Sequence, residues 1–445
     1  MSQDAWQERF RRVSPRCYQR DHDPSFGVVF QSAKSSTLID TNGEEWIDLT
    51  CGYSATNFGH CHDELLESLT KYASRLGHLT GDPHESRIEL AEKLAQLSFP
   101  AASDTKVLFS SSGARAVEAA WKAAVSFRPG KIVSLAPSLH GRSIATSQLG
   151  ATASTLLSSE LEQASWVQSA DQYPYCKCCP LGLEYPKCQT QCSDSLEAWI
   201  SEHHQEISAV LVEPVLTARG YVFPPAEYFL RIRQYTERYG VLLIADEIQS
   251  GMGRCGGWLL SQEQGWTPDV AVLGKSLGGG ILPLAAVVGR GEILDAIPSG
   301  AESETASGSP LACAIGCAAV ELLQNHKLAE RGCEIGEEMR RVSREQAEKN
   351  AVECRIDGHA ACCVFEFARA GNPTAIADSI KEQAVDSARH FASLCVEAKL
   401  KVHLSGPNLT RVVLLPALTI TESELETAMD RLSAVIRRFE RTGAG

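Results

Sequence analysis

Two short segments decide the fold of this chain: VLLIADEIQ at residues 241–249 and VAVLGKSLGGG at residues 270–280. Each begins as an unbroken apolar run, which is typical of a strand buried on both faces of a parallel sheet. The first run ends in Asp246 and Glu247, and the second ends in Gly274 and Lys275. Open α/β sheets bind ligands at the carboxyl ends of their strands, so these residues are predicted to line a site.

The two strand ends carry a specific chemistry. A lysine that loses its charge on burial becomes a nucleophile able to form a Schiff base. An aspartate at a neighbouring strand end can pair with a protonated pyridine nitrogen, as pyridoxal phosphate requires. Taken singly, Lys275 is more often a solvated strand end and Asp246 is more often a helix cap. Their occurrence together favours a pyridoxal-phosphate site.

The surrounding sequence alternates apolar runs with helical stretches. Further strands are predicted at KVLFS, KIVSLA, SAVLVEPV and AAVVGR, and helices at GARAVEAAWKAAVSF and AEYFLRIRQYTERYG. This alternation predicts an α/β fold with a mostly parallel sheet covered by helices. We place this large domain at residues 61–300.

The two ends of the chain predict a smaller α+β domain, formed by residues 1–60 and 301–445. The first 60 residues are expected to form short strands, because STLIDTNGEEWIDL alternates around the Asn42-Gly43 turn. After them, DELLESLTKYASRL has helical spacing. Beyond residue 300 the predicted order is helix, helix, two strands and a terminal helix.

Composition excludes several classes of protein. The formal charge of −13 argues against nucleic-acid binding, which demands a basic face. No apolar run approaches the ~20 residues of a membrane span, and the N-terminus lacks the apolar stretch of a secretory signal. The sequence therefore predicts a cytoplasmic protein.

The order of motifs resembles that of the class III pyridoxal-phosphate aminotransferases, the group with the ornithine, acetylornithine and 4-aminobutyrate enzymes. The landmarks cover nearly the whole chain and run in order: NFGHCHDELLES, SSSGARAVEAAWKAA, SLHGRS, VLVEPV, the two segments quoted first, SGSPLA and TRVVLLPALTITESEL. The resemblance implies a fold type I pyridoxal-phosphate transferase. It also implies ping-pong transfer of an amino group from a donor, usually a terminal amine, to a 2-oxo acid.

The resemblance assigns roles around the cofactor. Lys275 would form the Schiff base and then move a proton, Asp246 would bond the pyridinium nitrogen, and Gln249 would bond the phenolic oxygen. The phosphate would be held at a helix N-terminus, which attracts anions. The residues concerned there are Ser112, Gly113 and Ala114.

Further roles concern the substrate and a second subunit. Glu213 would lie on the substrate side, and Arg411 would grip a substrate carboxylate, although a surface arginine at a strand start stays an alternative. Thr305 matches a threonine that reaches the phosphate of a neighbouring subunit. This implies a homodimer or a dimer of dimers, as closed symmetry favours. His140 is expected to pack or to position the backbone.

Three departures from the family pattern leave the substrate more open than the cofactor. Leu139 stands where an aromatic residue usually stacks on the cofactor ring, and Arg115 stands where an acidic residue is common. The segment VLTARG after Pro214 brings Leu216 and Arg219 to the substrate side. A decarboxylase or ammonia-lyase on the same site therefore stays open. So does a cysteine-rich metal module on an inactive scaffold.

Five of the sixteen cysteines crowd into an insertion at residues 173–192. Cys176 and Cys179 form a C-x2-C pair, and Cys188 and Cys192 form a C-x3-C pair. Two such pairs can present four sulfurs tetrahedrally, which predicts a structural zinc or iron–sulfur site. Disulfides and plain reduced thiols stay alternatives, the former disfavoured in the cytoplasm.

Overall fold

The computed structural model describes residues 2–18, 23–135, 138–150, 167–170, 179, 181–217, 220–367, 378–406 and 409–442. Within these ranges no helix is both long and apolar enough to cross a bilayer, whose hydrocarbon core takes about 20 apolar residues.

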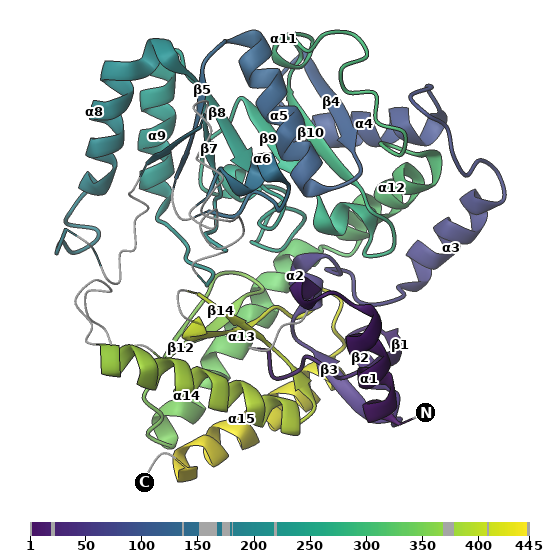
Figure 1. The fold of residues 1–445 in the computed structure, drawn as a ribbon, viewed down its shortest axis with the longest axis vertical. Coiled ribbons are helices and arrows are strands. Elements are labelled where there is room, and N and C mark those ends of the chain that lie inside the picture. The colour runs from purple at the N-terminus through teal and green to yellow at the C-terminus, as the bar shows by residue number, and fades with distance from the viewer. Residues whose placement is uncertain are drawn as a thin grey trace.

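A seven-stranded sheet lies at the centre of the upper part of the molecule in Figure 1. All of its strand pairs are parallel except those of β10, which runs antiparallel to both of its neighbours. The predicted mostly parallel sheet is therefore confirmed. Its strands, in spatial order, are β4 (Thr105–Ser110), β10 (Ala285–Arg290), β9 (Val270–Leu273), β8 (Leu242–Asp246), β7 (Ile207–Val212), β5 (Lys131–Leu135) and β6 (Val167–Ala170).

Helices cover both faces of this sheet because successive strand residues point to opposite sides. In β8, Leu242 and Ile244 pack with the alanine-rich side of α5, whereas Leu243 and Ala245 pack with α8 and α9. The second face continues over β9 and β10 to α4 and α12. The helices and short helical turns around this sheet are α3 (Asp63–Ala73), α4 (Glu85–Ser98), α5 (Gly113–Phe127), α6 (Ile144–Ser147), α8 (Asp194–His203), α9 (Ala226–Tyr239), α10 (Leu260–Glu263), α11 (Gly291–Leu294) and α12 (Pro310–Asn325).

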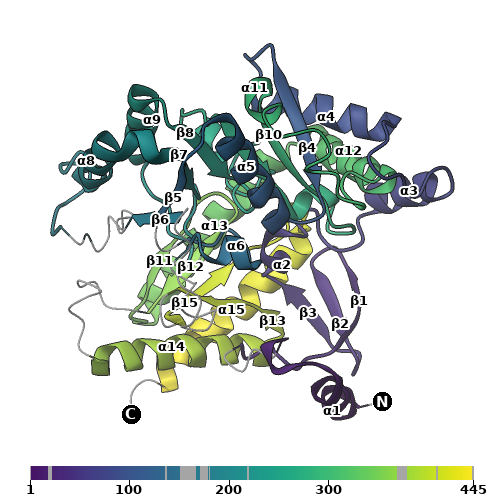
Figure 2. The ribbon, with the colours of Figure 1, turned by 45° about the horizontal axis from the view of Figure 1, so that its top comes forward.

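A four-stranded sheet joins the N-terminal strands to a strand from the far end of the chain (Figure 2). The predicted hairpin is present, and its second strand pairs in parallel with β13. The prediction of strands alone was wrong, because a helix precedes them: Ser2 caps it and arginines fill its last turn. The elements are α1 (Gln3–Val13), β1 (Phe30–Lys34), β2 (Thr37–Asp40), β3 (Glu45–Asp48), α2 (Cys51–Ser54) and β13 (Leu400–Lys401).

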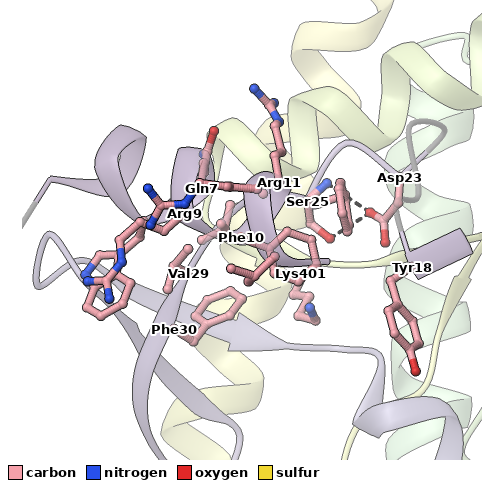
Figure 3. A pocket seen from close by; sticks show the side chains of 16 residues that line it. Gln7, Arg9, Phe10, Arg11, Tyr18, Asp23, Ser25, Val29, Phe30 and Lys401 are labelled. Atoms are coloured by element: carbon pink, nitrogen blue, oxygen red, sulfur yellow. Dashed lines mark hydrogen bonds between the residues drawn. The ribbon is translucent and has the colours of Figure 1, made fainter. Parts of the chain in front are cut away.

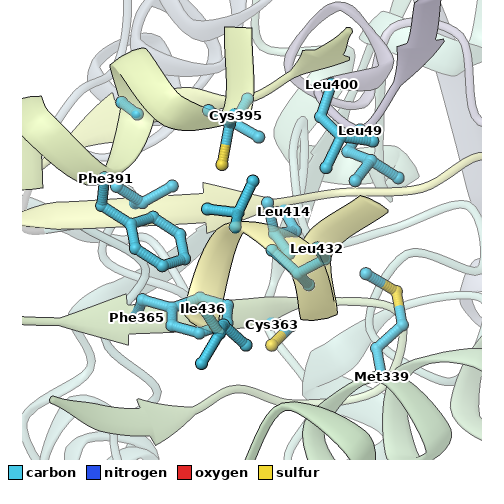
Figure 4. Close-up of a cluster of buried hydrophobic side chains, with 14 of the residues drawn as sticks. Leu49, Met339, Cys363, Phe365, Phe391, Cys395, Leu400, Leu414, Leu432 and Ile436 are labelled. Atoms are coloured by element: carbon cyan, nitrogen blue, oxygen red, sulfur yellow. The ribbon is translucent and has the colours of Figure 1, made fainter. Parts of the chain in front are cut away.

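A third, antiparallel sheet has one face buried under three long helices. Figure 4 shows the packing, in which Phe365 and Leu414 of the strands meet Phe391 and Leu432 of the helices. The predicted order after residue 300 was incomplete, since an amphipathic helix, α14, separates the strands. The elements are α13 (Leu328–Lys349), β11 (Arg355–Asp357), β12 (Cys363–Glu366), α14 (Asp378–Glu397), β14 (His403–Ser405), β15 (Arg411–Leu414) and α15 (Glu422–Thr442).

The pairing of β3 with β13 brings the two ends of the chain into one sheet, as a small domain built from both ends would require. The domain limits at residues 60 and 300 stay predictions. For the site, the decisive feature is the neighbouring parallel pair β8 and β9, in which Asp246 lies opposite Val272. Both strands end at the same edge of the sheet, and Asp246 and Lys275 come with them.

Candidate active site

Lys275 lies in a tight turn directly after β9, with a backbone φ of +49°. Its amine is largely enclosed, and this burial lowers its pKa from 10.5 to about 8. The carboxylates of Asp246 and Glu213 oppose the shift, while the charge of Arg142 adds to it. A far larger share of this amine is therefore neutral near pH 7 than for an exposed lysine, as a nucleophile needs.

Asp246, the last residue of β8, is held from two sides. Nδ1 of His140 donates to its Oδ2 over 2.8 Å, and the backbone N–H of Ile248 donates to its Oδ1 over 3.2 Å. The two side chains are 0% and 4% exposed for His140 and Asp246 respectively. A buried hydrogen bond to a carboxylate fixes the direction in which the carboxylate points. His140 thus positions a side chain, where the sequence predicted only packing or backbone positioning.

Gln249 connects Lys275 to a buried tyrosine. Its Oε1 accepts from Nζ of Lys275, and its Nε2 donates to the hydroxyl of Tyr221. Tyr221 is buried, which raises the pKa of its phenol well above the usual value. The tyrosine therefore keeps its proton. The row Lys275–Gln249–Tyr221 leads from the strand end toward the antiparallel sheet.

Glu213 follows β7 and shares the same interior. Its carboxylate accepts from the backbone N–H of Leu139 and from the hydroxyl of Thr217, both over 2.8 Å. Its pKa is raised to about 7, mainly by burial; the charge of Asp246 adds to the shift, while His140 and the two hydrogen bonds oppose it. Glu213 consequently holds Leu139 and, with it, the segment that carries His140.

The start of α5 closes the site on the third side. Ser112 is the helix cap, and its hydroxyl accepts from the backbone N–H of Arg115 over 3.4 Å. Gly113 lies directly against Ile248, since an added Cβ would lie 2.9 Å from Cδ1 of Ile248. Ala114 completes the predicted turn. A close approach of backbone N–H groups at a helix start suits a phosphate.

Arg411 is not a surface arginine. It is 7% exposed, with Nη2 and Nε bonded to one oxygen of Glu366 over 2.6 and 3.1 Å, and Nη1 donating to the carbonyl of Gly220 over 3.2 Å. Glu366 lies opposite Arg411 in the β12–β15 pair. The predicted carboxylate-binding arginine therefore already has a carboxylate partner within the chain.

Arg142 is a residue that sequence reasoning did not assign. It is exposed, lies two residues after His140 and acts electrostatically on Lys275. No ion pair of Arg142 is found among the described residues. The signal was available in SLHGRS, whose arginine follows the histidine of a family landmark.

Thr305 and the cysteines lie outside this constellation. Thr305 is exposed, and its carbonyl accepts from the hydroxyl of Thr80 over 3.4 Å. Cys192 is buried in the apolar core beneath α8 and α9. Cys179 and Cys188 are half-buried free thiols, and Cys176, like Arg219, lies outside the described residues. Within the described part no cluster of three potential metal ligands occurs, so the metal site stays an unsupported prediction.

A pocket of about 840 Å³ lies elsewhere, between α1 and the strand β1. Figure 3 shows Phe10, Val29 and Phe30 side by side in it, next to Lys401. None of the predicted site residues lines this pocket. Asp246 and Lys275 at the sheet edge therefore lie outside this pocket.

Comparison with known proteins agrees with this geometry. The aminotransferase class-III family matches residues 17–436. The chain is 29% identical over 447 residues to the leucine/methionine racemase of Thermococcus litoralis, covering 98% of this chain and 96% of that protein. It is 31% identical over 422 residues to an ornithine aminotransferase of Staphylococcus carnosus, covering 92% and 94%.

A solved structure gives the same picture. The crystal structure of an amine transaminase from an uncultivated Pseudomonas species, in its pyridoxal-phosphate-bound form, superposes with a TM-score of 0.81 at 26% identity, covering 92% of this chain and 95% of that one. With the fold, the lysine at the strand end and the family match in agreement, the chain belongs to the class-III aminotransferase family and is a pyridoxal-phosphate-dependent transaminase of fold type I.

Proposed function

We propose that this enzyme transfers an amino group from a small donor with a terminal amine to a 2-oxo acid, in two half-reactions at one site. The observation that carries the proposal is Lys275, an enclosed amine with a pKa near 8 beside Gln249. Such an amine is available for covalent attachment and for proton transfer at neutral pH.

The residues present fit pyridoxal phosphate. Gly113 lies directly against Ile248, whose backbone N–H donates to Asp246, so the start of α5 lies near this carboxylate. Nε2 of His140 is buried and has no hydrogen-bond partner among the described residues, which leaves a polar atom at the site for a ligand or water. When bound, the cofactor supplies a carbonyl carbon for amines and a ring that withdraws electrons.

The residues would divide the work as follows. Lys275 would hold the cofactor, and Asp246, oriented by His140, would keep the pyridine nitrogen protonated. Nζ of Lys275 would also take and return the substrate proton. Gln249 accepts from the same Nζ and so limits where the amine can move.

Two arginines are available for the carboxylate of a 2-oxo acid. Arg142 carries an exposed charge close to Lys275 and would attract the acid. Arg411 would bind it only by sharing or exchanging its bond to Glu366. We assign the first contact with the acid to Arg142 and place Arg411 and Glu213 on the substrate side of the site.

The site would be completed by a second copy of the chain. Thr305 is exposed, as expected for a side chain that serves a partner. A homodimer, or a dimer of such dimers, would give two shared sites related by symmetry.

The half-reactions are separable by experiment. The loaded enzyme is mixed with a panel of amine donors in the absence of an acceptor, and the absorbance of the bound cofactor is followed. One equivalent of donor consumed per site, with the original absorbance restored by a 2-oxo acid, supports transfer. Continuous turnover without an acceptor would overturn it.

The racemase among the relatives provides the second candidate function, because it is 29% identical over nearly the whole chain. Racemisation needs proton removal and return at one carbon and no net transfer. Exchange of the substrate α-hydrogen in deuterated water, together with inversion of L-leucine or L-methionine and no amine acceptor, would favour it.

A further inference from the structure

The first turn of α5 carries a cation where a helix favours an anion. Backbone N–H groups make the N-terminus of a helix positive, yet this turn holds Arg115 and no acidic residue. Three carboxylates from beyond the turn surround its guanidinium. Glu118 pairs with Nη1, Glu302 lies 3.5 Å from Nη2, and Glu304 lies 3.9 Å from Nε.

Glu304 bonds the residue immediately before the helix cap. Its two carboxylate oxygens accept from the backbone N–H of Ser111 over 3.1 Å and from the Ser111 hydroxyl over 2.5 Å. Charge-assisted bonds of this kind are about twice as strong as neutral ones. Glu304 therefore fixes the entry to the turn formed by Ser112, Gly113 and Ala114.

Glu302 holds the same loop further along α5. Its side chain is 8% exposed and pairs with both Arg115 and Lys122. Nζ of Lys122 also donates to the carbonyl of Ala301 over 3.1 Å. Because Glu302 is nearly buried, the loss of either cation would cost more than the loss of a partner in an exposed ion pair.

Thr305 directly follows Glu304 in the sequence, and the backbone on its C-terminal side is held as well. The carbonyl of Gly308 accepts from Nε2 of His84 over 3.0 Å. Gly308 has a φ of +58°, and a Cβ added there would lie 2.9 Å from Phe109. The backbone on either side of Thr305 is thus tied to its own subunit, while the residue itself is exposed.

We propose that Arg115, Glu302 and Glu304 form a clamp within one subunit. The clamp joins the phosphate turn, residues 112–114, to Thr305, the residue that would reach the phosphate of the partner subunit. The inference rests on the shared site of the proposed function. Arg115 and Glu304 contact neither cofactor nor substrate in this role. They are positioning residues, because the carboxylate of Glu304 holds Ser111, next to the phosphate turn, and Glu304 itself directly precedes Thr305.

The clamp is tested with Arg115→Ala, Glu304→Gln and the conservative Arg115→Lys. Lys106→Ala is the matched control, since Lys106 and Asp295 form an exposed pair that does not touch residues 301–305. The first measurement is hydrogen exchange of residues 298–309 in the cofactor-free protein. Faster exchange is expected in Arg115→Ala and Glu304→Gln, little change in Arg115→Lys, and none in the control.

The second measurement is the dissociation constant of pyridoxal phosphate, by titration of the apoenzyme. Arg115→Ala and Glu304→Gln should each bind pyridoxal phosphate roughly tenfold more weakly, which corresponds to the loss of one charge-assisted hydrogen bond. Thr305→Ala should weaken the affinity as well, and Arg115→Ala should add little in the Thr305→Ala background. If the double variant loses less binding free energy than the two single variants together, Arg115 acts through Thr305.

The outcomes separate this inference from the proposed function. Unchanged loop exchange in Arg115→Ala and Glu304→Gln overturns the clamp. Weaker cofactor binding in Thr305→Ala, with Arg115→Ala unaffected or fully additive, overturns the coupling and leaves the shared site standing. A fully active monomer with an inert Thr305→Ala variant removes the shared site, and the coupling falls with it.

Discussion

Replacing Lys275 by methionine should stabilise the cofactor-free protein at neutral pH, although it destroys the site. Burial lowers the pKa of Lys275 from 10.5 to about 8, so the folded state binds this proton less tightly than the unfolded state. Each tenfold change in proton affinity corresponds to about 1.4 kcal/mol, which makes the penalty about 3 kcal/mol at pH 7. Methionine avoids this penalty, but Oε1 of Gln249 loses its hydrogen bond from Lys275, which costs about 1 kcal/mol. The net gain is about 2 kcal/mol.

The sign of the pH dependence follows from the same values. Between pH 8 and 10.5 the folded chain has lost the proton that the unfolded chain keeps, so unfolding takes up a proton. The free energy of unfolding of the wild type therefore rises with pH through this window. From pH 7 to pH 10 the wild type should gain roughly 2.5 kcal/mol relative to Lys275→Met.

Urea unfolding of the apoenzyme at pH 7 and pH 10 measures this difference. The control is Lys349→Met, which removes an exposed lysine from the end of α13 and should follow the wild type. Parallel pH profiles for the wild type and Lys275→Met would refute the reasoning, because Lys275 would then titrate like an exposed lysine.

Four further outcomes are expected. Lys275→Ala should fold and transfer amino groups at less than about a hundredth of the wild-type rate with saturating substrates, since attachment and proton transfer both need its amine; substantial turnover contradicts this. Asp246→Asn should keep some cofactor but lose most of the rate, because an amide cannot hold the pyridinium proton; an unchanged rate makes Asp246 a cap. Glu213→Gln should flatten the decline in stability between pH 4.5 and 7, the window in which the unfolded chain has lost the Glu213 proton that the folded chain still keeps; identical unfolding profiles argue against it. Cys192→Ser should lower the free energy of unfolding by about 1–2 kcal/mol, because it places a hydroxyl in an apolar core. Metal analysis of the wild type tests the predicted cysteine site: zinc or iron supports the site, and the absence of both removes it.

The strands and helices around the site could be predicted because their signals are local. Apolar runs of four to six residues marked β7, β8 and β9, and the turn residues after them marked the strand ends. Two parallel strands that are neighbours in the sheet bring their last residues to one edge. The conjunction of Asp246 and Lys275 was therefore foreseeable from the sequence. The helix α1 was missed because a hairpin signal dominated the first 60 residues.

The side chains at strand ends and helix starts were predictable from local patterns: Asp246, Lys275, Glu213 and the turn from Ser112 to Ala114. The contacts that these side chains make were not, because they come from packing. His140 bonds Asp246 from 106 residues away, and Arg411 meets Glu366 45 residues away. Such contacts depend on the order and register of strands that are neighbours in the sheet but not in the sequence. The pKa shifts of the buried groups depend on the same packing. Hydrophobic periodicity predicts neither, because it indicates only which face of one helix or strand is buried.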